Sequence, residues 1–273
     1  MSRVKIILIS VLAVISSILV AREIQAQGCN GENILDCTIK QFYSDGKALF
    51  LSPFHWDKKE KVEFLLGATT TAGLFFADEE LQKIVQRNRS HFSDDLSNLV
   101  TPSEHVYPKV IIGSFYLGGL VFNRKKEKET AFYLLEALIF TQGITQGIKH
   151  LTGRARPFAE KGAFSFEGLR AHPSSYSLSF PSGHSATAFT LASVIAEQYN
   201  NKVIDILSYS LAFLAAWARV NDNAHFTSDV FFGGVLGHWV GKSIVRFNKE
   251  RMFKKLSFQT KVELNSLKVS FNF

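Results

Sequence analysis

The chain has 273 residues, of which 46% are hydrophobic and 20% charged, and its formal net charge is +7. This length suits one large domain or two small ones, and the composition excludes disordered, collagen-like and coiled-coil proteins. Two cysteines exclude a disulfide scaffold or a cysteine-rich zinc module, and the positive charge favours anionic partners such as nucleic acid, anionic lipid or phosphate esters.

Residues 1–26 are typical of a secretory signal peptide. A short basic start precedes an uncharged, mostly apolar run over 6–20, and cleavage is expected after Ala26. Because Ile24 stands where such signals favour alanine, an uncleaved anchor helix is the alternative. Both interpretations predict an exported protein of the cell envelope, with its bulk outside the cytoplasm.

Residues 27–125 are expected to form an N-terminal helical region. Its first part is polar and mixed, with turn signals that include Gly46 and Pro53. Cys29 and Cys37 lie near its start, and in an oxidising compartment they either close a small loop or remain two thiols. The sequence assigns no function to this region.

Apolar segments with few charges recur along the chain, and they contain Gly, Ala, Ser and Thr but no Pro. We expect each to form a helix, since none alternates like a strand. They cover residues 64–77, 110–122, 130–148, 185–196, 206–218 and 230–241. The predicted fold class is all-α, a bundle of about six core helices, with a core domain over 126–250. Most runs are shorter than the ~20 apolar residues of a spanning helix, so a membrane-embedded bundle and a soluble all-α domain both fit.

The C-terminal tail, residues 251–273, differs from the helical segments. Residues 262–273 partly alternate apolar and polar side chains and end in Phe273, which predicts a short strand-like segment. A single strand forms no barrel. The stretch 246–255 is basic, but it follows an apolar helix, so it suits a solvated helix end or an anionic membrane surface better than nucleic acid.

The first cluster of chemically informative residues contains Lys149 and Arg156-Pro157, with His150 and Arg154 between them. Cations at the end of a helix suit an anion, since Lys supplies a point charge and Arg a planar fork that binds two oxygens. A basic helix end beside a membrane gives the same pattern. We rank His150 and Arg154 below Lys149 and Arg156 as phosphate ligands.

The second cluster, Pro181-Ser182-Gly183-His184, opens an apolar helix. Free backbone N–H groups and the helix dipole favour an anion there, and Gly183 lets an oxyanion approach the backbone closely. His184 stands beside that anion, where it can donate a proton. An ordinary helix cap with an adjacent histidine is the alternative interpretation.

The third cluster contains Arg219, His225 and Asp229, with five residues between the first two and three between the last two. If a helix begins near His225, then His225 and Asp229 lie on one face of it. A carboxylate bound to one imidazole nitrogen fixes the tautomer and makes the other nitrogen a better nucleophile, while Arg219 adds a donor for an oxyanion. A surface histidine–aspartate pair is the alternative.

Together and in order, the three clusters resemble the type 2 phosphatidic acid phosphatase superfamily, which includes bacterial acid phosphatases and vanadium haloperoxidases. Its signature is Lys-x6-Arg-Pro, Pro-Ser-Gly-His and Ser-Arg-x5-His-x3-Asp, and the chain matches every spacing. The one departure is Ala218, where the family usually has Ser; this bears on phosphate affinity more than on the reaction. The resemblance covers roughly residues 130–247.

The resemblance implies phosphoryl transfer without a metal or other cofactor. His225 would attack phosphorus with Asp229 orienting it, and His184 would protonate the leaving oxygen and then activate water. The equatorial oxygens would be bound by Lys149, Arg156, Ser182, Gly183 and Arg219. We predict no metal site, since the other histidines show no ligand spacing: His55, His91, His105 and His172.

Two further features stand outside the signature. The aromatic residues between Pro157 and Pro181 form either a lid that contacts an acyl chain or a plain surface loop with a few anchoring rings. His238 lies in an apolar segment and is expected to be a packed, hydrogen-bonded core residue.

The leading hypothesis is a cell-envelope phosphatase that hydrolyses a phosphate monoester or pyrophosphate of a membrane lipid, with its active site on the periplasmic or extracytoplasmic side. A soluble periplasmic acid phosphatase of broad specificity shares every catalytic residue. A vanadium haloperoxidase is a third interpretation, disfavoured by the small size and the signal peptide, and a non-catalytic envelope protein that keeps the fold is a fourth. The sequence names neither the phosphate ester nor the oligomeric state.

Overall fold

The computed structural model describes residues 34–101, 106–169 and 175–270, with the side chains of the last helix described as far as Phe253. The expected signal peptide and Cys29 lie outside these ranges. Cys37 is disulfide-bonded, and Cys29 is the only other cysteine in the sequence.

Within these ranges every long element is an α-helix. There are eight α-helices: α2 (Ile34–His55), α3 (Lys58–Arg87), α4 (His91–Val100), α5 (Tyr107–Val121), α6 (Lys125–Thr152), α7 (Gly183–Tyr199), α8 (Lys202–Asn221) and α9 (Thr227–Ser270). Two short 3₁₀ turns, η1 (Pro157–Ala159) and η2 (Ser175–Ser177), lie between α6 and α7. The predicted all-α class is confirmed, with two more helices than the six that the apolar segments predict.

The six apolar segments lie within α3, α5, α6, α7, α8 and α9, apart from Phe122, which follows the end of α5. The turn signals at Gly46 and Pro53 are wrong, since both lie inside α2. Gly46 faces α6 so closely that a Cβ would lie 3.0 Å from the Phe140 ring. Pro53 removes the N–H that would bond the carbonyl of Leu49, and the Ser52 hydroxyl donates to that carbonyl instead, at 3.0 Å. Tertiary packing and a local substitute bond therefore keep both residues in a helix.

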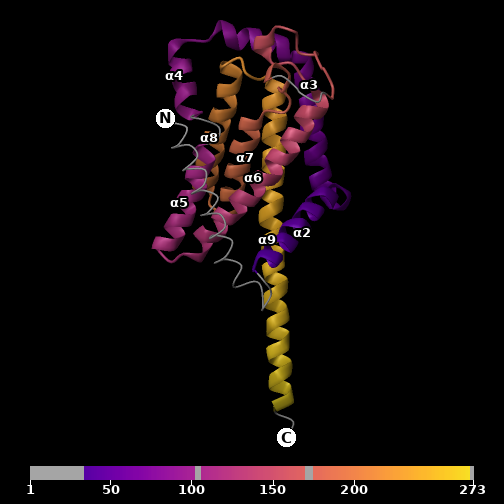
Figure 1. Ribbon diagram of the computed structural model, residues 1–273, viewed down its shortest axis with the longest axis vertical. Coiled ribbons are helices and arrows are strands. Elements are labelled where there is room, and N and C mark those ends of the chain that lie inside the picture. Colours follow the sequence, from indigo (N-terminus) through magenta and orange to yellow (C-terminus); the bar gives the residue numbers. More distant parts are fainter. Residues whose placement is uncertain (1–33, 102–105, 170–174, 271–273) are drawn as a thin grey trace.

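The predicted strand-like tail is also wrong for residues 262–270, which continue α9; residues 271–273 lie outside the described part. A lone strand leaves its backbone groups without partners, whereas a helix bonds them within itself. Figure 1 shows the C-terminal part of α9 running past the end of the bundle.

Helices α6 to α9 form an up-and-down bundle in which α7 packs against α6, α8 and α9. Its core contains the buried side chains of Leu134, Val194, Val240 and Ile244. The approach of α7 to α9 depends on glycines of α9, because a Cβ at Gly237 would collide with the carbonyl oxygen of Ala186. A Cβ at Gly233 would lie 2.5 Å from the carbonyl oxygen of Ser182, so the start of α7 packs closely against the first turns of α9.

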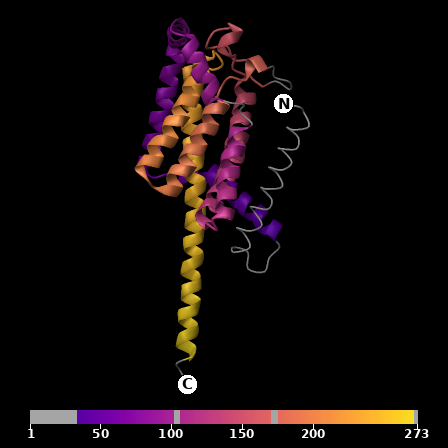
Figure 2. The same ribbon diagram turned by 90° about the vertical axis from the view of Figure 1, so that its left-hand side faces the viewer.

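The α6–α7 and α8–α9 connections lie at the same end of the bundle, which the C-terminal half of α3 also reaches (Figures 1 and 2). We call this the catalytic end, because it carries the three clusters that the sequence predicts to be catalytic. Large apolar side chains are exposed on the outer faces of several helices, among them Phe64, Phe76, Leu117, Ile139, Ile206 and Leu211. One helix of the described part, α8, is long and apolar enough to cross a membrane, with 28% of its apolar stretch buried.

Candidate active site

The catalytic end brings together the three sequence clusters. Helix α6 ends at Gly153, whose left-handed conformation (φ 56°) caps the helix and leaves no room for a Cβ beside Gly168. The segment after it pairs with the chain before α7, since the Ser179 N–H donates to the carbonyl of Arg154 at 3.0 Å. The Ser182 N–H in turn donates to the carbonyl of Asp229 at 2.9 Å, which joins α7 to α9.

The His225 ring is buried, with 2% of the residue exposed. Its Nδ1 lies 3.7 Å from Oδ2 of Asp229, longer than an ordinary hydrogen bond. Ser179 contacts both groups: its hydroxyl donates to the Asp229 carboxylate at 2.5 Å and lies 3.4 Å from Nδ1 of His225. The Phe226 N–H adds a bond to the same carboxylate oxygen at 2.9 Å, as in a capping box at the start of α9. The carboxylate is therefore fixed beside Nδ1, which leaves Nε2 for other chemistry.

Electrostatics keep His225 uncharged. Burial is the main cause that lowers the pKa of His225 to about 3, and the charges of Lys149 and Arg156 lower it further, while Asp229 opposes them. His225 lies in the loop between α8 and α9, and at neutral pH its imidazole is a neutral base with a free electron pair. The influence of both cations on this ring also places their charges near it.

The start of α7 presents an anion-binding arrangement. Ser182 is the helix cap, and its hydroxyl accepts from the backbone N–H of Ser185. The first N–H groups of α7, at Gly183 and His184, follow this cap at the positive end of the helix dipole. Ser182 is fully buried and His184 is partly exposed, so the histidine is the member of this cluster that faces outward.

The three cations of the signature are placed differently. Lys149 is 5% exposed and its Nζ donates to the carbonyl of Leu178 at 2.5 Å. The Arg156 backbone N–H is bonded to Tyr176 at 2.8 Å. The guanidinium of Arg219 instead bonds Asp222 and the hydroxyl of Thr101, the latter at 2.6 Å. In this structure Arg219 is therefore held by an acid and a hydroxyl.

Several residues at this end had no clear sequence signal. Arg154, ranked below the matched cations, is fully buried and bonds Asp229 and Asp78. Ser179, which contacts both His225 and Asp229, belongs to no recognised pattern. Asp78 ends the apolar run of α3, and an acid at the end of such a run is the only hint that the sequence offers.

The aromatic residues of the α6–α7 connection anchor it to α3. Phe166 and Phe180 pack on Phe75, and Phe164 packs on Phe76, with ring centroids 5.3–6.1 Å apart. These contacts favour an anchored loop over a free lid in the described part of the connection.

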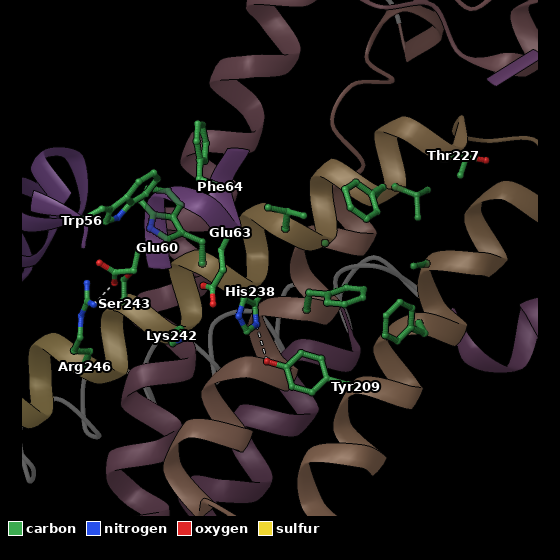
Figure 3. A pocket seen from close by; sticks show the side chains of 18 residues that line it. Trp56, Glu60, Glu63, Phe64, Tyr209, Thr227, His238, Lys242, Ser243 and Arg246 are labelled. Carbon is green, nitrogen blue, oxygen red and sulfur yellow. Dashed lines mark hydrogen bonds and ion pairs between the residues drawn. The ribbon is translucent and has the colours of Figure 1, made fainter. Parts of the chain in front are cut away.

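A groove of about 550 Å³ runs along α9 between α3 and α8 (Figure 3). It begins at Thr227, two residues after His225, and ends near Trp56 and Arg246. Its lining is mostly apolar and includes Phe64, Phe189, Phe213, Val230, Phe231, Val235 and Trp239. His238 lines it and bonds the Tyr209 hydroxyl at 2.7 Å; it is hydrogen-bonded as predicted, but it borders the groove rather than the core.

The sequence of this bundle is similar to those of known proteins. Residues 130–253 match the sequence model of the PAP2 superfamily. The lipid A 1-phosphatase of Rhizobium etli is 34% identical over 114 residues, which are 39% of this chain and 45% of that protein. The lipid A 1-phosphatase of Porphyromonas gingivalis is 33% identical over 94 residues, 31% of this chain and 21% of that protein. The matches thus span less than half the length of these curated relatives.

Two solved structures share the fold. LpxE of Aquifex aeolicus has a TM-score of 0.50 and 23% identity, over 62% of this chain and 94% of that one. The transmembrane PAP2 type phosphatidylglycerolphosphate phosphatase of Bacillus subtilis has a TM-score of 0.53 and 19% identity, over 71% of this chain and 98% of that one. The resemblance inferred from the three sequence clusters is confirmed: residues 130–253, which cover most of the α6–α9 bundle, match the PAP2 superfamily.

Proposed function

We propose that this protein is a phosphatase of membrane lipid phosphates that works through a phosphohistidine. The observation that carries the proposal is the buried, neutral His225, held by Asp229 on one side and placed near two cations and the start of α7. A neutral imidazole with one nitrogen oriented by a carboxylate is a nucleophile. Cations and helix N–H groups beside it suit the charge of a phosphoryl group.

In the first step, Nε2 of His225 attacks phosphorus, and the bond to the ester oxygen breaks. His184 gives its proton to that leaving oxygen. In the second step, His184 takes a proton from water, the hydroxide attacks phosphorus, and the bond to Nε2 breaks to release phosphate. The equatorial oxygens are bound by Lys149, Arg156, Arg219, Ser182 and the Gly183 N–H, so the chain supplies the positive charge without a metal ion.

A lipid substrate is supported by the apolar groove, one end of which lies at Thr227, two residues from His225 in the chain. An acyl chain laid along it would bring its phosphate to the catalytic end. The exposed apolar side chains of the bundle and the length of α8 also favour a protein embedded in a membrane. With the expected signal peptide, these features support the proposal that the site lies on the extracytoplasmic side. The names of the curated relatives make lipid A the first lipid to test.

The test is phosphate release by purified protein in detergent with a chelator present. A panel would compare lipid A, phosphatidylglycerol phosphate, phosphatidic acid, a polyprenyl pyrophosphate and a water-soluble aryl phosphate, with His225→Ala as the blank. Preference for one lipid supports the proposal, and better turnover of the aryl phosphate favours a soluble-type acid phosphatase. Quenching with radiolabelled substrate should trap an acid-labile, base-stable phosphoenzyme that His225→Ala lacks. No release above the blank on any substrate sinks the proposal.

A further inference from the structure

Asp78, in α3, lies far in sequence from the catalytic residues and outside the family-matched stretch. It is fully buried. Its Oδ1 accepts the backbone N–H of Ser228 at 2.9 Å, and its Oδ2 accepts the Ser228 hydroxyl and Nη2 of Arg154, the latter at 2.7 Å. Ser228 is the second residue of α9, so Asp78 satisfies one of the free N–H groups at the start of that helix.

Arg154 connects Asp78 to the catalytic carboxylate. Its Nη1 donates to Oδ1 of Asp229 at 2.6 Å and to the Ser228 hydroxyl at 2.7 Å, and its Nε donates to Ala163 at 2.9 Å. The guanidinium also lies over the Phe75 ring, 4.3 Å from its centroid. All three nitrogens are bonded within the protein, so Arg154 is placed to hold Asp229 rather than to bind phosphate.

Two connections therefore run from one carboxylate to the first turn of α9. One is the direct bond from Asp78 to Ser228, and the other passes through Arg154 to Asp229. Oδ2 of Asp229 lies 3.7 Å from Nδ1 of His225, and a displacement of about 1 Å in such a pair can lower a reaction rate severely. A residue that fixes this turn also fixes the alignment of the catalytic pair.

We infer that Asp78 is a positioning residue for the reaction: from outside the matched family domain, it holds Arg154 and the start of α9 so that Asp229 stays aligned with His225. The inference rests on the proposed function, because it concerns the orientation of the proposed nucleophile. It also gives α3, which the signature leaves without a role, a part in catalysis.

The direct test is Asp78→Asn, which keeps the shape but removes the charge that holds Arg154. We expect kcat to fall about 10- to 100-fold, the range seen when a hydrogen-bond partner that orients a metal ligand is lost. KM should change less than about threefold, because the bonds described for Asp78 go to Ser228 and Arg154 and not to a proposed phosphate ligand. Glu80→Gln is the matched control: it removes the same charge from the same turn of α3, where the side chain is exposed and, within the described part of the chain, bonds only Lys83. Its kinetics should equal those of the wild type.

A double mutant separates positioning from general damage. If Asp78 acts through Asp229, then Asp78→Asn should lower kcat little further in an Asp229→Asn background, whereas unrelated damage would multiply the two losses. Should Asp78→Asn fail to fold, Asp78→Asn with Arg154→Gln removes both buried charges together. That variant should also have a low kcat, and a wild-type kcat in it overturns the inference.

A readout independent of turnover distinguishes failure of this inference from failure of the proposed function. In protein labelled with ¹⁵N-histidine, the His225 resonances are identified by their absence in His225→Ala. The wild type should show one tautomer with Nδ1 protonated toward Asp229, and Asp78→Asn should show a second tautomer. Wild-type resonances in Asp78→Asn overturn the inference even if the enzyme is active; a shifted tautomer in a protein that hydrolyses none of the panel overturns only the proposed function.

Discussion

Both ends of the bundle contain an arginine paired with buried carboxylates, but the two networks differ in what surrounds them. At the catalytic end, Arg154 lies between Asp78 and Asp229, and all three side chains are 0% exposed. At the opposite end, Arg251 pairs with buried Asp45 from α2. There the network continues through Asn248, which joins α9 to Glu136 of α6 and Gln41 of α2.

The difference lies in what each network faces. The carboxylate of Asp229 is directed at a neutral histidine, beside a helix start and two cations. The carboxylates of Asp45 and Glu136 at the opposite end face each other, an amide and a guanidinium, and no histidine is among the described side chains that bond them. An arginine with two acids is thus no sign of catalysis by itself. We expect damage at the catalytic end to appear as lost turnover and damage at the opposite end as lost stability.

The largest effect should come from Asp229→Asn. The amide keeps the size of the side chain but cannot hold the Nδ1–H tautomer of His225, and the corresponding change in serine proteases lowers kcat about 10⁴-fold. We expect a loss of about 10³- to 10⁴-fold in kcat on the best substrate of the panel, measured on protein whose thermal midpoint shows that it is folded. A folded Asp229→Asn variant with kcat within tenfold of the wild type contradicts the assigned role.

The complementary change at the opposite end is Arg251→Met. It leaves Asp45 buried without its guanidinium, and because Arg251 is partly exposed we expect a loss of about 2–3 kcal/mol in the free energy of unfolding. The kcat per folded molecule should stay within twofold of the wild type. Lys83→Met, which removes an exposed cation, is the control and should change neither quantity. A large drop in kcat for Arg251→Met would contradict the expectation that damage at the opposite end affects stability and not turnover.

Acid should weaken the catalytic end in particular. The folded pKa of His225, about 3, lies below its ordinary value of 6.5, so the unfolded chain binds a proton that the folded chain refuses. The contribution of His225 to the free energy of unfolding is therefore fully present above pH 6.5 and is lost as the pH drops toward 3. The loss is about 2 kcal/mol at pH 5. The thermal midpoint of the wild type should fall more between pH 7.5 and 5 than that of His225→Gln. Equal falls would contradict a neutral, buried His225, and His150→Gln, at an exposed site, should behave as the wild type.

The helical bundle and the pairing of His225 with Asp229 could be predicted from the sequence because both depend on local patterns. Apolar periodicity specifies which helix faces are buried, and the spacing from His225 to Asp229 is local, so one helix start sets it. The turn predicted at Gly46 and Pro53 is wrong because the fold stabilises a helix there. Gly46 packs against the Phe140 ring, and the Ser52 hydroxyl replaces the hydrogen bond that Pro53 cannot donate. Such compensation is invisible without the fold.

The connections that support the site were not predictable in the same way. Asp78 and Ser228 are 150 positions apart in the chain, and only the packing of α3 on α9 brings them together. No spacing rule links them, and a lone acid after an apolar run is most often a solvated helix end. Long-range polar pairs of this kind have to be read from the structure.

The smallest expected effect concerns Asp222, which bonds Arg219 and is itself held by the Ser97 hydroxyl of α4 at 2.6 Å. In the proposed mechanism, a phosphate bound beside His225 competes with this carboxylate for Arg219. Asp222→Asn removes the competing charge but leaves an oxygen that can still accept from the guanidinium. We expect the inhibition constant for inorganic phosphate to fall about three- to tenfold, with kcat changed less than twofold.

The matched comparison is Asp94→Asn, which removes an equal charge from α4 at a side chain that bonds Arg89 and Asn221 rather than Arg219. Its inhibition constant should equal that of the wild type. The gain in Asp222→Asn should shrink at high salt, because the partly exposed ion pair is screened. Weaker phosphate binding in Asp222→Asn would mean that the Asp222 carboxylate orients Arg219 toward the phosphate instead of competing for it. Helix α4, whose Ser97 holds Asp222, would then support phosphate binding.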